Sequence, residues 1–130
     1  MSGLTIRACK FSEVQPLVGA GRKERVTFDD NERCTWIGAF KEGRIVGSLC
    51  VVVNTDKKSA RIKSCFVVKE ERGKGTFSRL FEAGFKHCLL SKVKKVTAFA
   101  TPMSRPMFLK YGFVIKTWKS GDIAFLQREL

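Results

Sequence analysis

The amino-acid sequence predicts an α/β (α+β) fold in which helices flank a mixed, mostly antiparallel sheet. Residues 35–68 hold three β-rich runs separated by turn sequences, a pattern typical of an antiparallel meander. A strand, an amphipathic helix and another strand then follow over residues 60–100, and such a crossover places its two strands in parallel. With 130 residues, 44% of them hydrophobic, the chain is predicted to form one domain, residues 1–130.

The N-terminal part of the chain carries the weakest signals. Residues 4–10 alternate apolar and polar side chains, which suits a first strand. Residues 11–22 have a weak helical spacing that Pro16 interrupts and two glycines close, so we expect only a short helix there. Residues 23–34 show no clear period and are expected to form a loop or a poor helix.

The meander has two clear turns, Glu42-Gly43 and Asn54–Lys57, which both have residue types favoured in turns. The run between these turns is apolar on both faces. We therefore expect its strand to lie in the middle of the sheet and to be covered on both sides.

From Thr76 onward the period of the apolar residues changes from two to between three and four, which predicts a core-facing helix. Its apolar residues are Phe77, Leu80, Phe81, Gly84, Phe85, Cys88 and Leu89. The strand that completes the crossover is predicted at residues 93–100.

A short second helix is predicted after this crossover. Ser104 is a suitable N-cap, and the helix is expected to run to Tyr111. Two further β-like runs, residues 113–119 and 122–130, meet at Ser120-Gly121 and complete the predicted sheet.

The connection before the long helix has the features of an anion site. In "VVKEERGKGTFSRLFEAGF" (67–85), Gly73 and Gly75 alternate with Arg72 and Lys74 just before the predicted helix start. The first N–H groups of a helix have no intrahelical partners, and the helix dipole adds partial positive charge there. We expect this turn to bind phosphate.

This segment resembles the acetyl-coenzyme A signature of the GNAT family of N-acetyltransferases, in which Arg or Gln is followed by x-x-Gly-x-Gly/Ala and a long helix. Arg72 and Gly75 fill two signature positions, and Phe77 stands where the family usually has Gly or Ala. "FKEGRIVGSLCV" (40–51) is similar to the family's hairpin, and "MFLKYGF" (107–113) resembles its second signature. The abbreviated N-terminal region is similar to that of small phage-encoded members.

The resemblance implies that acetyl-coenzyme A (acetyl-CoA) lies between two splayed parallel strands, residues 60–68 and 93–100. It also implies a pantetheine arm paired with the first of these strands and a pyrophosphate held by the glycine turn. The residues that it assigns to the cofactor are Phe66, Val67, Val68, Arg72, Gly73, Lys74, Gly75, Thr76, Phe77 and Phe108.

The catalytic groups that the resemblance implies are less complete. A tyrosine usually protonates the departing thiolate, but this chain has Phe108 at that position. Tyr111, about one helical turn farther on, is the candidate acid; the alternative is an amphipathic tyrosine of the core or its rim. Asp29, Asp30 and Glu32 fall in the region that would border the acceptor, where they could attract an amine or take its proton; the alternative is a solvated acidic loop.

Two functions follow from these observations. The first is an acetyl-CoA-dependent N-acetyltransferase that passes an acetyl group to a primary amine by direct attack. The alternative is a weakly active or inactive binding protein on the same scaffold, which contacts nucleic acid or an acidic protein. It rests on the net charge of +13, because residues 57–119 alone hold sixteen basic and three acidic residues and so suit a polyanionic partner.

The sequence also sets expectations for location and metals. The N-terminal residues lack the apolar stretch of a signal peptide, and the longest apolar run, residues 49–53, is too short to cross a membrane. We expect a cytoplasmic protein without a membrane partner. The five cysteines contain no C-x-x-C pair, so no metal site is expected.

Overall fold

The computed structural model describes residues 3–130 and contains one mixed sheet in the order β1-β2-β3-β4-β5-β7-β6. The strands are β1 (Leu4–Cys9), β2 (Cys34–Lys41), β3 (Arg44–Asn54), β4 (Ser59–Val67), β5 (Lys95–Ala100), β6 (Val114–Ser120) and β7 (Ile123–Glu129). The helices are α1 (Phe11–Lys23), α2 (Thr76–Leu90) and α3 (Arg105–Lys110), with a short 3-10 helix at Lys69–Glu71. The predicted fold class and element order are confirmed.

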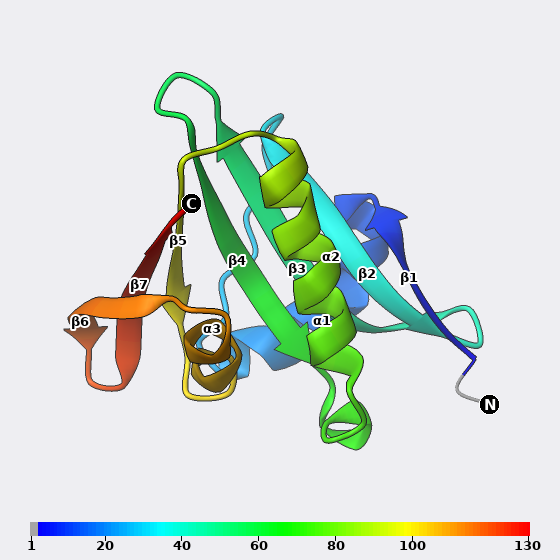
Figure 1. Ribbon diagram of the computed structural model, residues 1–130. Helices are drawn as coiled ribbons and strands as arrows, with labels where there is room; N and C mark the ends of the chain where they lie inside the picture. Colours follow the sequence, from blue (N-terminus) through cyan, green and yellow to red (C-terminus); the bar gives the residue numbers. More distant parts are fainter. Residues whose placement is uncertain (1–2) are drawn as a thin grey trace.

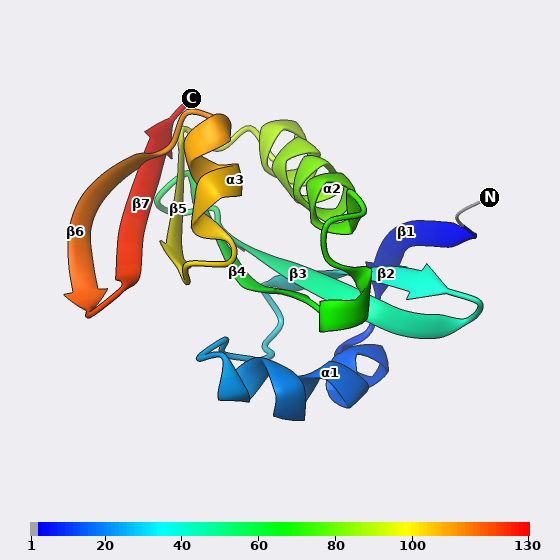
Figure 2. The same ribbon diagram turned by 90° about the horizontal axis from the view of Figure 1, so that it is seen from below.

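The molecule has three layers (Figure 1). Helix α1 lies on one face of the sheet, and α2 and α3 lie on the other (Figure 2). Two buried clusters fill the space between the layers, one beneath α1 around Phe28 and Trp36, the other beneath α2 around Phe81 and Phe108. Burial of these large aromatic side chains supplies most of the hydrophobic stabilisation of each layer.

Strand β3 lies at the centre of the meander, as predicted. It pairs antiparallel with β2 on one side and with β4 on the other. Residues Ile45–Val51 are all buried, because α1 packs on one face of this strand and α2 on the other. The apolar character of both faces of β3 is therefore explained by two helical layers.

Helix α1 corrects the predicted short helix. It continues through Pro16 to Lys23, since Pro16 removes only one N–H donor and Val14, Leu17 and Val18 are buried against the sheet. Its later glycines also remain helical. Tertiary burial outweighs the poor helix propensity of the segment.

Helix α2 forms where the spacing predicts it, with Leu80, Phe81 and Cys88 fully buried. The prediction was wrong for Leu89, whose side chain is 51% exposed. Leu89 lies in the last turn of the helix, one position past the fully buried Cys88 and at the edge of the apolar face.

Strands β4 and β5 form the parallel pair of the crossover. They pair only over residues 59–62 and 95–98, and beyond Ile62 and Ala98 they diverge toward their carboxyl ends (Figure 1). On its other side β5 pairs antiparallel with β7. The second half of β4 therefore has β3 along one edge and no strand along the other.

None of the helices within residues 3–130 is long and apolar enough to span a membrane.

Candidate active site

The glycine turn joins β4 to α2 through backbone that favours glycine. Gly73 and Gly75 have φ values of 77° and 83°, and Gly75 is the N-cap of α2. The first helical hydrogen bond runs from the Arg79 N–H to the Gly75 carbonyl at 3.2 Å. Within the described part of the chain, the N–H groups of residues 73–78 have no hydrogen-bond acceptor. This row of free donors at a helix N-terminus can bind an anion.

The charged side chains of the turn are already paired within the protein. The Arg72 guanidinium donates to both carboxylate oxygens of Glu24 at 2.9 and 2.8 Å and to the Val67 carbonyl at 2.8 Å. Glu71 is only 8% exposed and lies 3.4 Å from the Lys41 ammonium and 3.7 Å from that of Lys74. The turn thus offers an anion its backbone N–H groups, while its arginine connects it to the end of α1.

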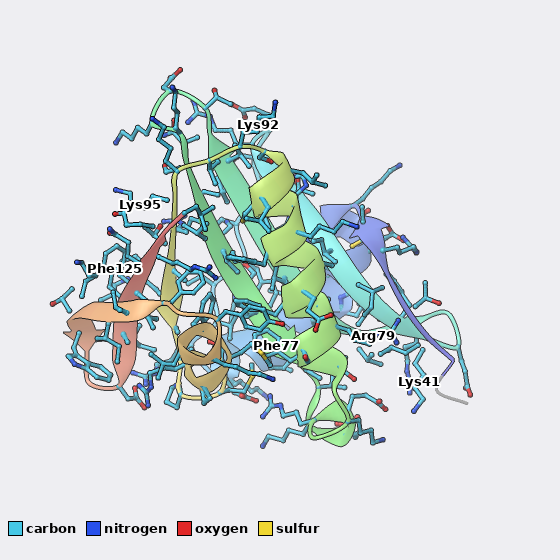
Figure 3. All side chains as sticks on the ribbon, in the orientation of Figure 1. Lys41, Phe77, Arg79, Lys92, Lys95 and Phe125 are labelled. Atoms are coloured by element: carbon cyan, nitrogen blue, oxygen red, sulfur yellow. The ribbon has the colours of Figure 1, made fainter. Side chains whose placement is uncertain are left out.

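A cavity of about 280 Å³, here called the turn cavity, opens beside these N–H groups. The glycines line one side of it, and Val67, Phe77, Met103 and Met107 supply apolar walls. Phe77 lies at the N-terminal end of α2 on the side that faces α3 (Figure 3). A β-carbon at Gly73 or Gly75 would have no protein atom within 4 Å, so the backbone is open to a ligand. Free N–H donors next to an apolar hollow fit a pyrophosphate joined to a less polar arm.

The residues assigned to the cofactor divide into two groups. Those that line the turn cavity are Val67, Arg72, Gly73, Gly75, Thr76 and Phe77. Phe66 and Phe108 are instead core residues, each 1% exposed, and the Val68 N–H is already donated to the Val46 carbonyl at 2.9 Å. Lys74 lies at the turn but outside the cavity lining. Phe108 packs edge-on against Phe81, with 5.0 Å between ring centroids.

A second and larger cavity, of about 390 Å³, lies where β4 and β5 have separated. We call it the cationic cavity, because Arg25, Arg61, Lys63 and Lys119 line it against one acidic residue, Asp29. These residues come from the end of α1, from β4 and from β6. The four positive charges could not be grouped from the sequence, because nearly a hundred residues separate the first from the last.

The two cavities lie along the same divergent strands. On β4, Ser64 and Cys65 line the cationic cavity and Val67 lines the turn cavity. After β5, Ser104 faces the first and Met103 the second. A reactive group held at the junction would therefore be accessible to ligands from both cavities.

A β-bulge shapes the wall between the cavities. Lys63 and Phe66 of β4 are three positions apart, whereas their partners Cys50 and Ser48 on β3 are only two positions apart. Ser64 adopts a left-handed φ of 55° within this bulge. The buried Ser48 hydroxyl donates to the Ser64 carbonyl at 2.9 Å, which satisfies the backbone group that the bulge displaces from the ladder.

The three acidic residues of the expected acceptor border have different surroundings. Asp29 lines the cationic cavity, and its backbone carbonyl accepts a hydrogen bond from the Lys63 ammonium at 2.5 Å. A carboxylate oxygen of Asp30 instead accepts from the Trp36 indole N–H at 2.9 Å, and Glu32 is exposed outside the lining. Of the three, only Asp29 is placed to act on a ligand in this cavity.

Tyr111 lies outside both cavity linings. Its ring packs against Phe81 and Phe85, and its hydroxyl donates to a carboxylate oxygen of Glu82 at 3.3 Å. Desolvation, together with the negative charge of Glu82 and the hydrogen bond to it, raises the pKa of Tyr111. A phenol in these surroundings is held as a neutral donor to Glu82.

Cys65 is the one thiol that lines either cavity among residues 3–130. The side chain is 7% exposed, and burial raises the pKa of this thiol far above its ordinary value. Because the thiolate is the nucleophilic form, a neutral buried thiol is a poor covalent catalyst. No sequence pattern predicted this cysteine beside the site.

A family model described as an acetyltransferase (GNAT) domain matches residues 15–119, which include the meander, the glycine turn, β5, the turn cavity and all of the cationic cavity lining except Ser120 and Ile123. The chain belongs to the GNAT family. The family resemblance that the two signatures predict is thereby confirmed. No curated protein sequence gives a significant match to this GNAT chain.

Solved structures share the GNAT fold over essentially the whole chain. An acetyltransferase from Streptococcus agalactiae is 16% identical with a TM-score of 0.76, and 100% of each chain is covered. Escherichia coli ElaA is 15% identical with a TM-score of 0.79, covering 97% of this chain and 99% of its own. The PaiA N-acetyltransferase from Thermoplasma acidophilum, in complex with coenzyme A, is 11% identical with a TM-score of 0.76, at coverages of 98% and 99%.

Proposed function

We propose that this GNAT protein is an acetyl-CoA-dependent N-acetyltransferase that passes an acetyl group to a primary amine by direct attack. One observation carries the proposal: the separation of β4 from β5 leaves two cavities lined by neighbouring residues of the chain, one beside free backbone donors and one lined by polar side chains. Two ligands that must react with each other need such an arrangement. The coenzyme A bound to PaiA supports the choice of cofactor.

The turn and the free edge of β4 would hold the cofactor. The N–H groups of residues 73–78 would bind the pyrophosphate, and Val67 and Met107 would contact the arm that leads to the junction. Acetyl-CoA would supply there the thioester whose acetyl group is transferred. The unpaired edge of β4 beyond Ile62 is available for main-chain hydrogen bonds to that arm.

The cationic cavity would hold and activate the amine. The amine must be neutral to attack the thioester, and Asp29 is the cavity-lining residue that can take the amine proton, directly or through water. Water is the proton source for the departing sulfur, since Tyr111 faces Glu82. Cys65 stays protonated, which favours direct transfer over an acetylated enzyme.

Two measurements test this function in order. Calorimetry should detect coenzyme A binding, and a saturating excess of one hundred times the dissociation constant should raise the free energy of unfolding by about 2.7 kcal/mol. Mass spectrometry of an amine panel incubated with acetyl-CoA and the protein should then reveal an acetylated product. Tight cofactor binding without transfer to any amine would contradict the enzyme and favour a cofactor-binding protein.

A second candidate function rests on a basic surface remote from both cavities. The β3–β4 turn and the loop after α2 lie together, because the Lys94 N–H donates to the Lys58 carbonyl at 2.7 Å. This places Lys57, Lys58, Lys92, Lys94 and Lys95 near the end of the sheet opposite the glycine turn, where Lys92 and Lys95 are seen in Figure 3. Such a cluster suits the phosphate backbone of nucleic acid.

The second candidate is tested by retention on duplex DNA or heparin. Binding should fall steeply with salt, and replacing Lys57 and Lys92 by Gln should reduce the slope of log affinity against log salt by roughly two. Absence of retention at low salt would remove this candidate and leave the enzyme unaffected.

A further inference from the structure

The charges of the cationic cavity differ from those expected around a positively charged acceptor. Four cationic side chains and one carboxylate line it. Two of the cations have partners: Arg25 pairs with Asp122 in the β6–β7 turn, and Lys63 donates to the Asp29 carbonyl. Even with Asp122 included, the cavity keeps an excess of positive charge.

Arg61 and Lys119 supply this excess. Across residues 3–130, neither side chain has an acidic group within 4.0 Å, although Lys119 lies 4.9 Å from the Phe99 ring centroid. One comes from β4 and the other from β6, so the fold brings both to the cavity beside the gap that opens between β4 and β5. Two unpaired cations that line one concavity are suited to an anionic group of a ligand.

Two residues that line the cationic cavity have left-handed backbone conformations. Arg25 follows α1 with a left-handed φ of 63°, a conformation that usually requires glycine at a helix end. Ser64, on β4, also has a left-handed φ of 55°. Such residues persist where the surrounding structure holds them, and here both line the same cavity.

We infer that the acceptor is a small primary amine that also carries a carboxylate or phosphate group, an inference that rests on the proposed acetyltransferase function. Arg61 and Lys119 bind the anionic group, and Asp29 lies in the same cavity to receive the amine proton. The positive charges also lower the pKa of a bound amine, so more of it is neutral and nucleophilic. Polyamines and lysine-rich peptides are repelled.

Matched acceptor pairs test the inference in the intact protein. O-phosphoethanolamine is compared with ethanolamine, and β-alanine with β-alaninamide, each at fixed acetyl-CoA. We expect kcat/KM to be at least tenfold higher for the anionic member of at least one pair, with an advantage that shrinks as salt is added. The pair with the larger ratio identifies phosphate or carboxylate as the preferred group.

Removal of the Arg61 and Lys119 charges then tests whether the preference for an anionic acceptor comes from the cationic cavity. The double variant Arg61→Gln/Lys119→Gln should lose about tenfold or more in kcat/KM for the anionic acceptor, mainly through KM, and little for its neutral partner. The control Lys86→Gln/Lys110→Gln removes the same net charge from exposed positions outside both cavities and should retain the preference. Coenzyme A affinity, measured on every variant, should stay unchanged.

The outcomes separate this inference from the proposed function. Efficient acetylation of neutral or cationic amines with no anionic preference would overturn the inference and keep the enzyme. An anionic preference that survives in the double variant would overturn the roles of Arg61 and Lys119. Failure to acetylate every amine would overturn the inference together with the proposed function.

Discussion

The two cavities along β4 and β5 are built from different parts of the polypeptide. The turn cavity offers mainly backbone N–H groups and apolar walls, whereas the cationic cavity offers charged side chains from the loop after α1, from β4 and from β6. The first therefore depends on local geometry within one short segment, and the second on where the fold brings distant strands. The turn cavity is thus a backbone site, which a change in backbone conformation disrupts. The cationic cavity is a side-chain site, which a change in side-chain charge disrupts.

The largest effect should follow from a change in the backbone site. Gly75→Asp forces a non-glycine residue into φ 83° and brings a negative charge to the free N–H groups. Coenzyme A affinity measured by calorimetry should fall by more than about a hundredfold. Gly43→Asp is the matched control, because Gly43 has φ 77° in the β2–β3 turn and also has open space around it. If Gly75→Asp binds coenzyme A normally, the turn is not the pyrophosphate site.

A smaller effect is expected from one carboxylate of the side-chain site. Asp29→Asn removes the lining group that can accept a proton, so kcat should fall by about a hundredfold at neutral pH while coenzyme A affinity stays the same. The deficit should narrow at higher pH, where more of the acceptor amine is already neutral. Asp30→Asn is the control, since the Asp30 carboxylate contacts Trp36 outside the cavity. Equal losses for both variants would mean that the loop acts through structure alone.

The β-bulge between the two cavities can be tested through the stability of the protein. Ser48→Ala removes the donor to the Ser64 carbonyl and leaves this oxygen without its partner inside the bulge. We expect the free energy of unfolding, measured by urea denaturation, to fall by about 1–3 kcal/mol. KM for the acceptor should rise as well, because Ser64 lines the cationic cavity. A stable variant with unchanged KM would show that the bulge does not depend on Ser48.

The smallest effect concerns Tyr111. Removing its hydroxyl breaks a hydrogen bond to Glu82 outside both cavities, so Tyr111→Phe should change kcat by less than about twofold. General acid catalysis contributes on the order of 10² to 10⁴-fold, so a loss of that size would instead identify Tyr111 as the acid. Because the folded state raises the pKa of this phenol, its contribution to stability is present below its unfolded pKa and is lost as pH rises through the folded value.

The sequence predicted the backbone site better than the side-chain site. Gly73 and Gly75 lie two residues apart directly before a helix, so a local pattern was enough to locate the turn. The cationic cavity combines residues 25 and 29 with 61, 63 and 119, and no spacing relates these segments before the sheet order is known.

The parts of the fold that differ from the sequence predictions do so for the same reason. Helix α1 passes through Pro16 because burial on the sheet outweighs local propensity, and Leu89 is exposed because it lies at the edge of the face that α2 packs on the sheet. The pairing of Arg72 with Glu24 joins segments 48 residues apart and leaves no trace in the glycine pattern. Each is decided by tertiary contacts, which a single sequence does not contain.

The Glu24–Arg72 pair has a consequence for how the two ligands bind. Arg72 belongs to the turn, and Glu24 immediately precedes Arg25 of the cationic cavity. A phosphate that draws the Arg72 guanidinium toward itself would weaken the pair with Glu24, the residue next to Arg25. The cofactor and the acceptor would then bind cooperatively or antagonistically through this one contact. Thermodynamic reciprocity requires each ligand to change the affinity of the other by the same factor, so Glu24→Gln should change this coupling factor equally whichever ligand is bound first.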